Sequence, residues 1–431
     1  MKKVLTKDQV WDVAVIGGGP AGMMAAGRAA ELGAKVLLIE KNDSLGRKLL
    51  ITGGGRCNVT NAEFDTRTLL AKYKDAGKFL ASPFSQWNVP ETLDFFHARK
   101  MPTKVEAEKR VFPVSDSAQS VWDVLVNYLK DGKVTVLSKS PVMGFVTHDK
   151  KIVAVRLKDK TEIQARSFIL ATGGLSRPET GSTGDGFKWL AELGHTVNTA
   201  SAALVPVRTR DPWIKRLAGV SLKDVKISIF QNNTKQESRI GNILFTHVGL
   251  SGPGILNMSG MIGELLEYGT VHLEIDTLPG LDYAALNTRL QEIIKEHHVK
   301  KIRNSLGDLV PSALVPVVIE LAHINPDTPC NSITRTERIA LGNILKHLPI
   351  QVDGLLGLDK AVVTSGGVRC EEVDFKTMRS RLYDNLYLVG DILDIDRPSG
   401  GYSLQLCWTT GFVAGSATMG AMVPIAPITQ A

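Results

Sequence analysis

The sequence predicts an α/β fold in which a parallel sheet is built from both ends of the chain and is interrupted by an inserted module. Two observations predict it. Near the N-terminus, an apolar strand over 11–16 runs into a glycine-rich turn and an Ala-rich helix, and a second strand follows over 35–39. Near the C-terminus, a buried strand over 385–389 ends in Gly390-Asp391. Between these regions the sequence pattern changes, which indicates an inserted module.

The first turn has the spacing of a dinucleotide-binding loop. Gly17 permits the tight turn, Gly19 lets the backbone approach a pyrophosphate, and Gly22 lets the helix pack against the sheet. A phosphate bound there lies at a helix N-terminus, where free N–H groups and the helix dipole favour an anion. Glu40 ends the second strand, roughly 20 residues beyond the glycines, where a carboxylate accepts hydrogen bonds from a ribose diol. The residues predicted to hold this half of the cofactor are Gly17, Gly19, Pro20, Ala21, Gly22 and Glu40.

The turn alone does not separate NAD from FAD, because both present the same adenosine diphosphate half. A strand over 161–170 runs into Ala171-Thr172-Gly173, a frequent feature of FAD domains. Asp391 is placed to accept a hydrogen bond from a ribitol hydroxyl, a group that NAD lacks. A helix beginning at Gly401-Tyr402-Ser403 would stabilise the negative charge that a flavin gains on reduction, although a plain loop before a helix also explains the glycine. Together these features favour FAD.

A second glycine-rich segment adds candidates for binding and chemistry. Its backbone N–H groups, with the side chains of Arg56 and Asn58, suit hydrogen bonding to flavin N5, flavin O4 or a substrate carbonyl. Lys48 either neutralises the pyrophosphate or lies in solvent. Cys57 is expected to be a buried thiol, since no histidine neighbours it in the sequence. The further predicted cofactor-binding residues are Lys41, Lys48, Thr52, Gly53, Gly54 and Gly55.

The chain resembles the bacterial YhiN/BaiN-like flavoproteins, the group that includes aminoacetone oxidase-like enzymes. The Thr-Gly-Gly-Gly-Arg-Cys-Asn loop is the most specific element of the resemblance. The resemblance implies a glutathione-reductase-type Rossmann FAD-binding domain with an inserted β-rich and helical domain. It also implies a flavin oxidoreductase activity whose substrate varies by member. The segments that carry it are 17–22, 52–61, 180–186, 245–253, 363–368 and 390–405.

The same signatures set the expected domain borders. The FAD domain occupies 8–194 and resumes over 346–431, and the insert, a substrate or cap domain, occupies 195–345. Within the insert, 225–230 alternates as a strand does, and 282–297 has apolar residues at helical spacing within a helical segment at about 280–325.

Composition fits a large soluble enzyme of 431 residues, 43% of them hydrophobic. No apolar run reaches the ~18 residues that a membrane span needs, and the start lacks a signal-peptide core, so a cytoplasmic location without membrane attachment is expected. The four cysteines form no CxxC pair, which argues against a disulfide framework, a metal site and a redox-active dithiol.

The net charge of +7 raises the question of a nucleic-acid partner. The basic residues are dispersed, and the densest patch, 295–303, is typical of a solvated helix end. A positive field serves an anionic small substrate equally well, so nucleic acid is not expected. The oligomeric state is not fixed by the sequence.

The leading functional hypothesis is an FAD-dependent oxidoreductase that exchanges hydride between flavin N5 and a small organic substrate, as an amine oxidase or an enone/alkene reductase. No second GxGxxG occurs mid-chain, so the flavin is expected to be reduced either by the substrate itself or by NAD(P)H that docks transiently. Oxygen is the other candidate co-substrate. His247, in the 245–253 motif, is the histidine best placed for proton transfer, and a structural loop histidine is the alternative. The competing hypotheses are an FAD-containing RNA-modifying or nucleic-acid-binding protein and an NAD-dependent dehydrogenase.

Overall fold

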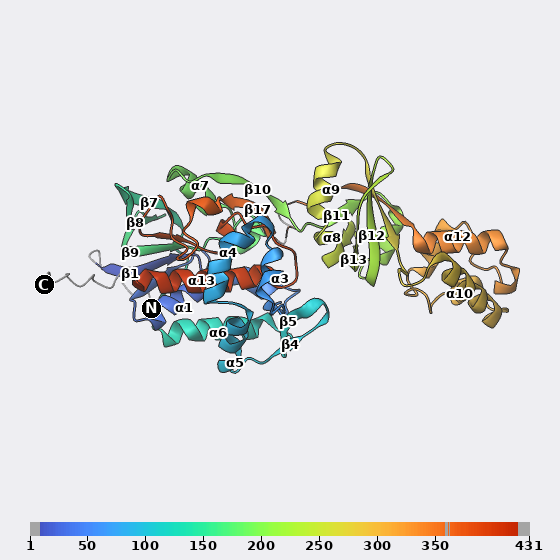
Figure 1. The fold of residues 1–431 in the computed structure, drawn as a ribbon, viewed down its shortest axis with the longest axis horizontal. Helices are drawn as coiled ribbons and strands as arrows, with labels where there is room; N and C mark the ends of the chain where they lie inside the picture. The colour runs from blue at the N-terminus through green and yellow to red at the C-terminus, as the bar shows by residue number, and fades with distance from the viewer. Residues whose placement is uncertain (1–8, 358–360, 362, 421–431) are drawn as a thin grey trace. The chain divides into compact units, whose positions relative to one another are not determined.

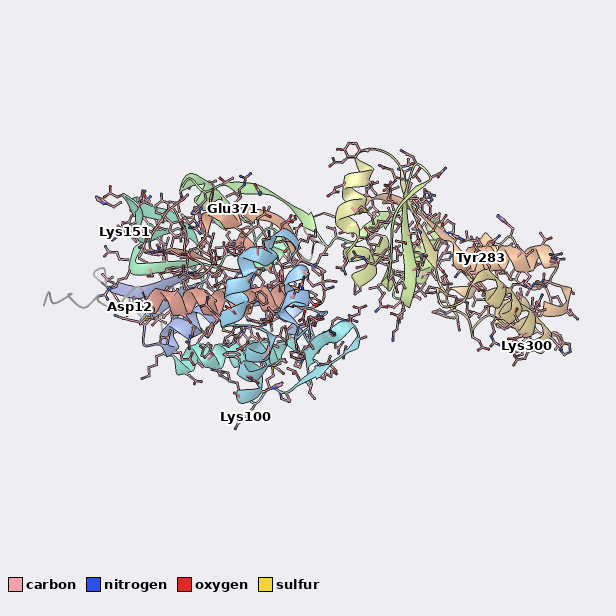
Figure 2. The ribbon with its side chains drawn as sticks, in the orientation of Figure 1. Asp12, Lys100, Lys151, Tyr283, Lys300 and Glu371 are labelled. Carbon is pink, nitrogen blue, oxygen red and sulfur yellow. The ribbon has the colours of Figure 1, made fainter. Side chains whose placement is uncertain are left out.

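The computed structural model describes residues 9–357, 361 and 363–420, and these divide into two compact units (Figure 1). The first unit is Met1–Ala202 with Val362–Ala431, and the second is Ala203–Ala361. Each unit has its own hydrophobic core, and the side chains of both are drawn in Figure 2. The insert is therefore an independently packed body within the chain.

The first unit is built on a mainly parallel sheet with strand order β6-β2-β1-β9-β8-β7, in which β18 also pairs with β9. Strand β9 has β8 beside its first half and β18 beside its last residues. The pairs β6-β2, β2-β1, β1-β9 and β9-β18 are parallel, whereas β9-β8 and β8-β7 are antiparallel. The strands are β1 (Val10–Ile16), β2 (Val36–Ile39), β6 (Thr135–Leu137), β7 (Val142–His148), β8 (Lys151–Leu157), β9 (Glu162–Leu170) and β18 (Leu386–Leu388).

Helices cover this sheet, and small residues let two of them approach closely. A Cβ added at Gly411 would lie 2.6 Å from the Ala21 carbonyl oxygen, and one at Gly415 would lie 2.6 Å from that of Ala25, so α13 packs directly on α1. The helices of this unit are α1 (Pro20–Glu31), α2 (Arg47–Ile51), α3 (Thr66–Ala71), α4 (Gly77–Gln86), α5 (Val89–Ala98), α6 (Ala118–Asp131), α7 (Asp185–Glu192) and α13 (Tyr402–Gly420).

Two smaller sheets complete the first unit. Strand β5 lies between β3 and β4, and β10 pairs with β17, so the two segments that lead into and out of the insert run side by side. Their bounds are β3 (Thr60–Asn61), β4 (Thr103–Val105), β5 (Arg110–Pro113), β10 (Val197–Ala203) and β17 (Val363–Val368).

The second unit is a closed antiparallel barrel with strand order β11-β14-β13-β12-β15-β16, accompanied by helices. The strands are β11 (Val207–Thr209), β12 (Ser221–Gln231), β13 (Thr234–Thr246), β14 (Gly249–Ser251), β15 (Val271–Asp276) and β16 (Leu348–Leu355). The helices are α8 (Pro253–Leu256), α9 (Ser259–Leu266), α10 (Tyr283–Glu296), α11 (Val315–Leu321) and α12 (Arg335–Lys346). The insert extends past the expected border at 345 because β16 closes the barrel by pairing with β15 and β11.

In the part of the chain that the structure describes, no helix combines the length and the apolar character that crossing a membrane requires. The α/β class, with a parallel sheet drawn from both ends of the chain and a β-rich and helical insert, is confirmed.

Candidate functional site

Segments far apart in the sequence meet at the carboxyl edge of the parallel sheet. Ile16 lies opposite both Ile39 and Leu170, and Leu388 lies opposite Leu170, so these strands end together. The Gly17 N–H donates to the Ile39 carbonyl at 2.8 Å. Ligands of open α/β sheets bind at this edge. The predicted cofactor residues that follow these strands, Gly17, Glu40, Thr172, Gly173, Gly390 and Asp391, are therefore brought to one place.

The three glycines of the first turn differ in why they are needed. Gly17 has φ +105°, and a Cβ there would lie 2.5 Å from the Ala171 carbonyl oxygen. A Cβ at Gly22 would lie 1.9 Å from the Gly17 oxygen, so both positions are fixed by protein packing. A Cβ at Gly19 meets nothing within 4 Å. Gly19 is also the N-cap of α1 and supplies no side-chain cap to the first N–H groups, which fits an anion approaching at this point.

Glu40 and Lys41 have protein partners in the structure. The buried Glu40 carboxylate accepts the Gly18 and Asn42 N–H groups, each at 2.8 Å, and so fixes the glycine turn to the end of β2. The Lys41 ammonium lies 2.7 Å from a carboxylate oxygen of Asp185 and 2.5 Å from the Thr183 hydroxyl. Their contacts to ribose and cofactor stay predictions, alongside these structural roles.

Two side-chain oxygens among the predicted site residues are buried without a hydrogen-bond partner in the described residues. They are Thr172 Oγ1, just beyond β9, and Asn58 Oδ1, in the glycine-rich loop. Asn61 Oδ1, on β3 beside Gly400, is a third. Buried polar atoms in folded proteins almost always have partners, so these acceptors fit a ligand that brings N–H or O–H donors. A flavin and its ribityl chain carry such donors.

The Asp391 carboxylate has a buried cationic partner that the sequence analysis missed. Arg397, whose side chain is fully buried, forms an ion pair with Asp391. Arg397 also donates to the Ser403 hydroxyl at 3.0 Å and to the Ile395 carbonyl at 2.6 Å. A sequence signal exists, since an arginine six residues after Asp391 precedes Pro-Ser-Gly-Gly, but nothing in that pattern indicates burial.

Lys48 is half-buried rather than solvated. Its ammonium hydrogen-bonds to the Ser176 hydroxyl at 3.0 Å. Burial lowers the pKa of Lys48, and the nearby Asp391 carboxylate offsets part of that effect. No carboxylate of the described residues lies within ion-pair distance of this ammonium, so a bound phosphate group would supply a missing counter-charge.

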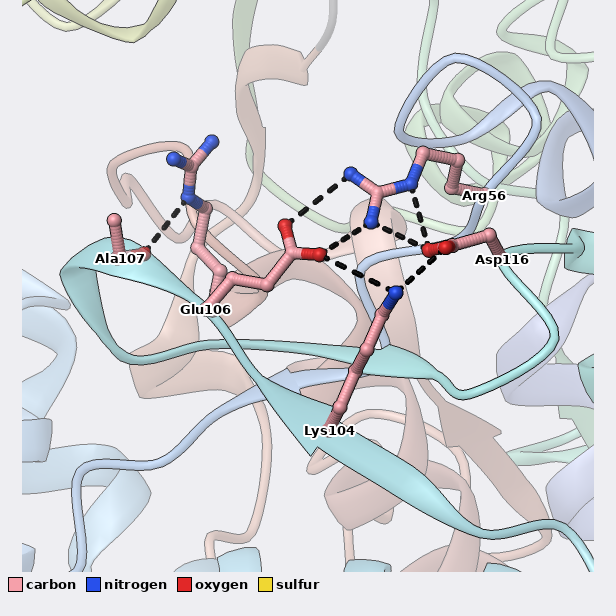
Figure 3. A network of polar contacts seen from close by, with 6 residues as sticks. Arg56, Lys104, Glu106, Ala107 and Asp116 are labelled. Atoms are coloured by element: carbon pink, nitrogen blue, oxygen red, sulfur yellow. Dashed lines mark hydrogen bonds and ion pairs between the residues drawn. The ribbon is translucent and has the colours of Figure 1, made fainter.

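The glycine-rich loop is held in a left-handed conformation and anchored by Arg56. Gly53, Gly54 and Gly55 have φ of +61°, +68° and +85°, and Cys57 has +63°. The Arg56 guanidinium contacts the carboxylates of Glu106 and Asp116 (Figure 3). It also lies 4.2 Å from the centre of the Phe112 ring. The hydrogen bonds that Arg56 donates to both carboxylates raise its pKa. These contacts occupy most of its N–H groups, and its catalytic role stays a prediction.

Three other predicted residues lie in or beside this loop. Cys57 is buried, as expected, and burial raises the pKa of its thiol. The Thr52 hydroxyl donates to the Lys48 carbonyl at 2.8 Å, which closes the end of α2. Roles in cofactor binding for Thr52 and in catalysis for Asn58 stay predictions.

The start of α13 packs closely against β3. Gly401 has φ +103°, and a Cβ there would lie 2.3 Å from the Thr60 backbone carbon and oxygen. The Tyr402 carbonyl accepts the buried Tyr73 hydroxyl at 2.9 Å, and Thr60 donates to Gln405 Oε1 at 2.6 Å. This close packing explains why residue 401 is a glycine. The flavin contacts of Gly401, Tyr402 and Ser403 stay predictions.

His247 belongs to the second unit. It lies in the turn between β13 and β14, and its side chain is exposed. The Thr246 hydroxyl accepts the Gly249 N–H at 3.1 Å and holds this turn. The role of His247 in proton transfer stays a prediction.

Comparison with known proteins identifies the chain's relatives. The model of the HI0933-like protein Rossmann domain matches residues 11–417. A 3-dehydro-bile acid delta(4,6)-reductase of Clostridium scindens is 30% identical over 408 residues, covering 94% of this chain and 98% of the relative. A ribosomal RNA dihydrouridine synthase of Escherichia coli is 32% identical over 407 residues, covering 93% and 96%.

Among solved structures, a 3-ketosteroid delta1-dehydrogenase from Sterolibacterium denitrificans has a TM-score of 0.53 at 14% identity and covers 96% of this chain and 100% of that one. A 3-ketosteroid-delta4-(5alpha)-dehydrogenase from Rhodococcus jostii has a TM-score of 0.53 at 15% identity, with coverage of 96% and 98%. At this identity the likeness shows a shared fold. The resemblance found in the sequence is confirmed by the family match: this chain belongs to the HI0933-like family of Rossmann-domain proteins.

Proposed function

We propose that this chain is an FAD-dependent oxidoreductase that reduces a carbon–carbon double bond conjugated to a carbonyl group. The observation that carries the proposal is the common chemistry of the two relatives that align over nearly their whole length. A delta(4,6)-reductase of a 3-dehydro-bile acid and a dihydrouridine synthase both saturate a double bond conjugated to a carbonyl. Of the two activities expected from the sequence, amine oxidase and enone/alkene reductase, this reaction is the second.

The residues at the carboxyl edge of the sheet suit FAD. The first turn and the N-terminus of α1 receive the diphosphate, and Lys48 contributes positive charge. Thr172 and Asn58 offer buried acceptors to the ligand. When bound, the reduced cofactor supplies a hydride for the carbon β to the carbonyl, while a proton goes to the α carbon. The electrons come from NAD(P)H that docks transiently, because the sequence contains no second dinucleotide motif.

Two substrate classes fit this chemistry. The first is a small organic enone, the substrate class of the leading sequence hypothesis. The second is a uracil base in ribosomal RNA, and a specific observation favours it. A second relative named ribosomal RNA dihydrouridine synthase, from Haemophilus influenzae, is 28% identical over 402 residues, covering 92% of this chain and 96% of the relative. The net charge of +7 suits a polyanion.

One anaerobic experiment tests the reaction and the substrate class. The purified protein is reduced with NADH or NADPH while its visible flavin spectrum is recorded. A 3-oxo-Δ4 steroid or in-vitro transcribed ribosomal RNA is then added to the reduced protein. An amine is added anaerobically to a separate sample that holds oxidised flavin and no NAD(P)H, and oxygen is admitted to that sample last with an assay for peroxide. We expect reoxidation of the flavin by the enone or the RNA, with two hydrogen atoms gained by the product in mass spectrometry. Reduction of the flavin by the amine, with peroxide formed on admitting oxygen, would replace the proposal with an amine oxidase.

A further inference from the structure

A groove of about 410 Å³ lies between α10 and α12 of the second unit, in the helical part of the insert. The two helices run antiparallel there, since Tyr283 contacts His347 at one end and Leu290 lies near Gly342 further along. The groove is lined by Tyr283, Leu286, Asn287, Leu290, Gln291, Arg335, Arg338, Ile339, Gly342 and Asn343. None of the residues discussed above for FAD lies in it.

The charged residues that line the groove are positive. Its lining includes two arginines and no acidic residue. Within the described part of the chain, neither Arg335 nor Arg338 forms an ion pair, whereas Arg289 and Arg216 of the same unit pair with Glu292 and Glu320. Guanidinium groups that are free of carboxylates are the usual partners of phosphates, because their N–H groups match two phosphate oxygens at once.

The uncharged lining is suited to bases. Tyr283, Asn287 and Gln291 follow one another at four-residue spacing, which places them along one face of α10. Asn287 accepts from Arg338 Nε at 3.0 Å, so its amide N–H₂ is oriented by an arginine of the groove. Tyr283, labelled in Figure 2, is 51% exposed as a residue, and its ring stacks on that of His347 with 6.0 Å between the ring centres. Exposed aromatic rings stack on unpaired bases, and side-chain amides hydrogen-bond to their edges.

We propose that this groove binds single-stranded RNA, with Arg335 and Arg338 on the phosphates and with Tyr283, Asn287 and Gln291 on a base. An acidic peptide would satisfy the arginines but would leave the amide face and the exposed ring without matched groups. The inference rests on the RNA branch of the proposed function and names the surface of the insert that would hold such a substrate.

The test compares two double variants of the full-length holoprotein that remove equal charge. Arg335→Ala with Arg338→Ala changes the groove, and Arg216→Ala with Arg289→Ala removes two arginines that are paired elsewhere on the same unit. Binding of a fluorescein-labelled oligouridylate is measured by anisotropy over a range of salt concentrations. We expect the groove variant to bind roughly tenfold more weakly and its slope of log K against log salt to fall by about 1.4, the value for two phosphate contacts on a single strand. The control should bind like the wild type.

Equal loss of binding in both double variants would overturn the proposal, because it would indicate a diffuse positive field. Absence of RNA binding by the wild type at low salt would overturn it as well. Competition by polyglutamate as effective as that by oligouridylate would assign the groove to an acidic protein partner instead. On the same samples, we measure anaerobic reduction of the flavin by NAD(P)H and its reoxidation by a small enone or by ribosomal RNA. Failure of both substrates to reoxidise the flavin would contradict the proposed function, while a result confined to RNA binding concerns the groove alone.

Discussion

At the scale of single residues, Gly19 offers a clean test of where the cofactor lies. Its backbone has φ −78°, and a Cβ meets nothing within 4 Å, so Gly19→Val should fold like the wild type. We expect the variant to purify without bound FAD, since a branched side chain would occupy the space of the diphosphate. Flavin absorbance after denaturation measures the occupancy. Gly280→Val, at another open position, is the control and should retain FAD. Full FAD occupancy in Gly19→Val would show that the diphosphate does not lie at this turn.

The sequence predicted the glycines well and the charged residues poorly. Gly17 and Gly22 obey local spacing rules, so the packing that requires them could be anticipated. The buried ion pair of Arg397 with Asp391 and the link from Arg56 to Glu106 depend on how distant segments fold together. No local pattern distinguishes such an arginine from one in solvent.

Arg397 leads to a prediction about stability. A lysine in its place keeps the charge but cannot reach Asp391, Ser403 and Ile395 together, so a buried carbonyl loses its donor. We expect Arg397→Lys to lower the free energy of unfolding by about 2 kcal/mol, the cost of one or two unmade buried hydrogen bonds. Urea denaturation followed by circular dichroism measures it. Arg289→Lys, at a partly exposed position, should change stability by less than about 0.5 kcal/mol. A similarly small effect at Arg397 would show that its buried contacts add little.

At the scale of elements, the sequence predicted the strands and helices with strong periodicity, and their pairing explains what it missed. The segment 282–297, with apolar residues at helical spacing, contains α10, and the alternating segment 225–230 lies within β12. The expected border at 345 precedes β16, because the ladder that draws β16 into the barrel is made with β15 and β11, far away in the sequence. Periodicity reports the buried face of a segment and carries no information about its partner strand.

One polar network joins elements of the first unit and predicts a pH dependence. The His195 side chain, after α7, is buried between Glu372 Oε2 at 2.9 Å and Ser380 Oγ at 3.0 Å. The Ser380 oxygen accepts the Leu382 and Tyr383 N–H groups, so its own O–H donates to the imidazole and the ring is neutral. Burial lowers the pKa of His195, and Glu372 offsets part of that effect.

The direction of the pH effect follows from this lowered pKa. Below the unfolded pKa of about 6.5, the histidine of the unfolded chain binds a proton more readily than the buried His195 does. The contribution of His195 to the free energy of unfolding is therefore full above that pH and decreases as the pH falls below it. We expect urea midpoints to drop between pH 7 and pH 5 by less in His195→Gln, which keeps a donor and an acceptor but does not titrate, than in the wild type. Equal drops in the two proteins would show that this histidine does not control the acid sensitivity.

At the scale of the whole molecule, the predicted FAD-binding residues and the insert lie in different units. All of the predicted FAD-binding residues belong to the first unit, whose sheet is completed by strands from both ends of the chain. The barrel and helices of the second unit close on a separate core. An insertion of this kind is compatible with folding because β10 and β17 pair, which brings the two points of connection together.

This division predicts that FAD binding survives removal of the insert. Replacing residues 204–361 by a short Gly-Ser linker joins the ends of two paired strands and leaves the carboxyl edge of the sheet unchanged. We expect the shortened protein to purify yellow and to unfold in one cooperative transition, and a separate chain of residues 203–361 to fold around its own barrel core without flavin. Absorbance and circular dichroism measure both. A shortened protein that is folded but colourless would mean that residues of the insert take part in holding FAD, and the cofactor site would then have to be drawn across both units.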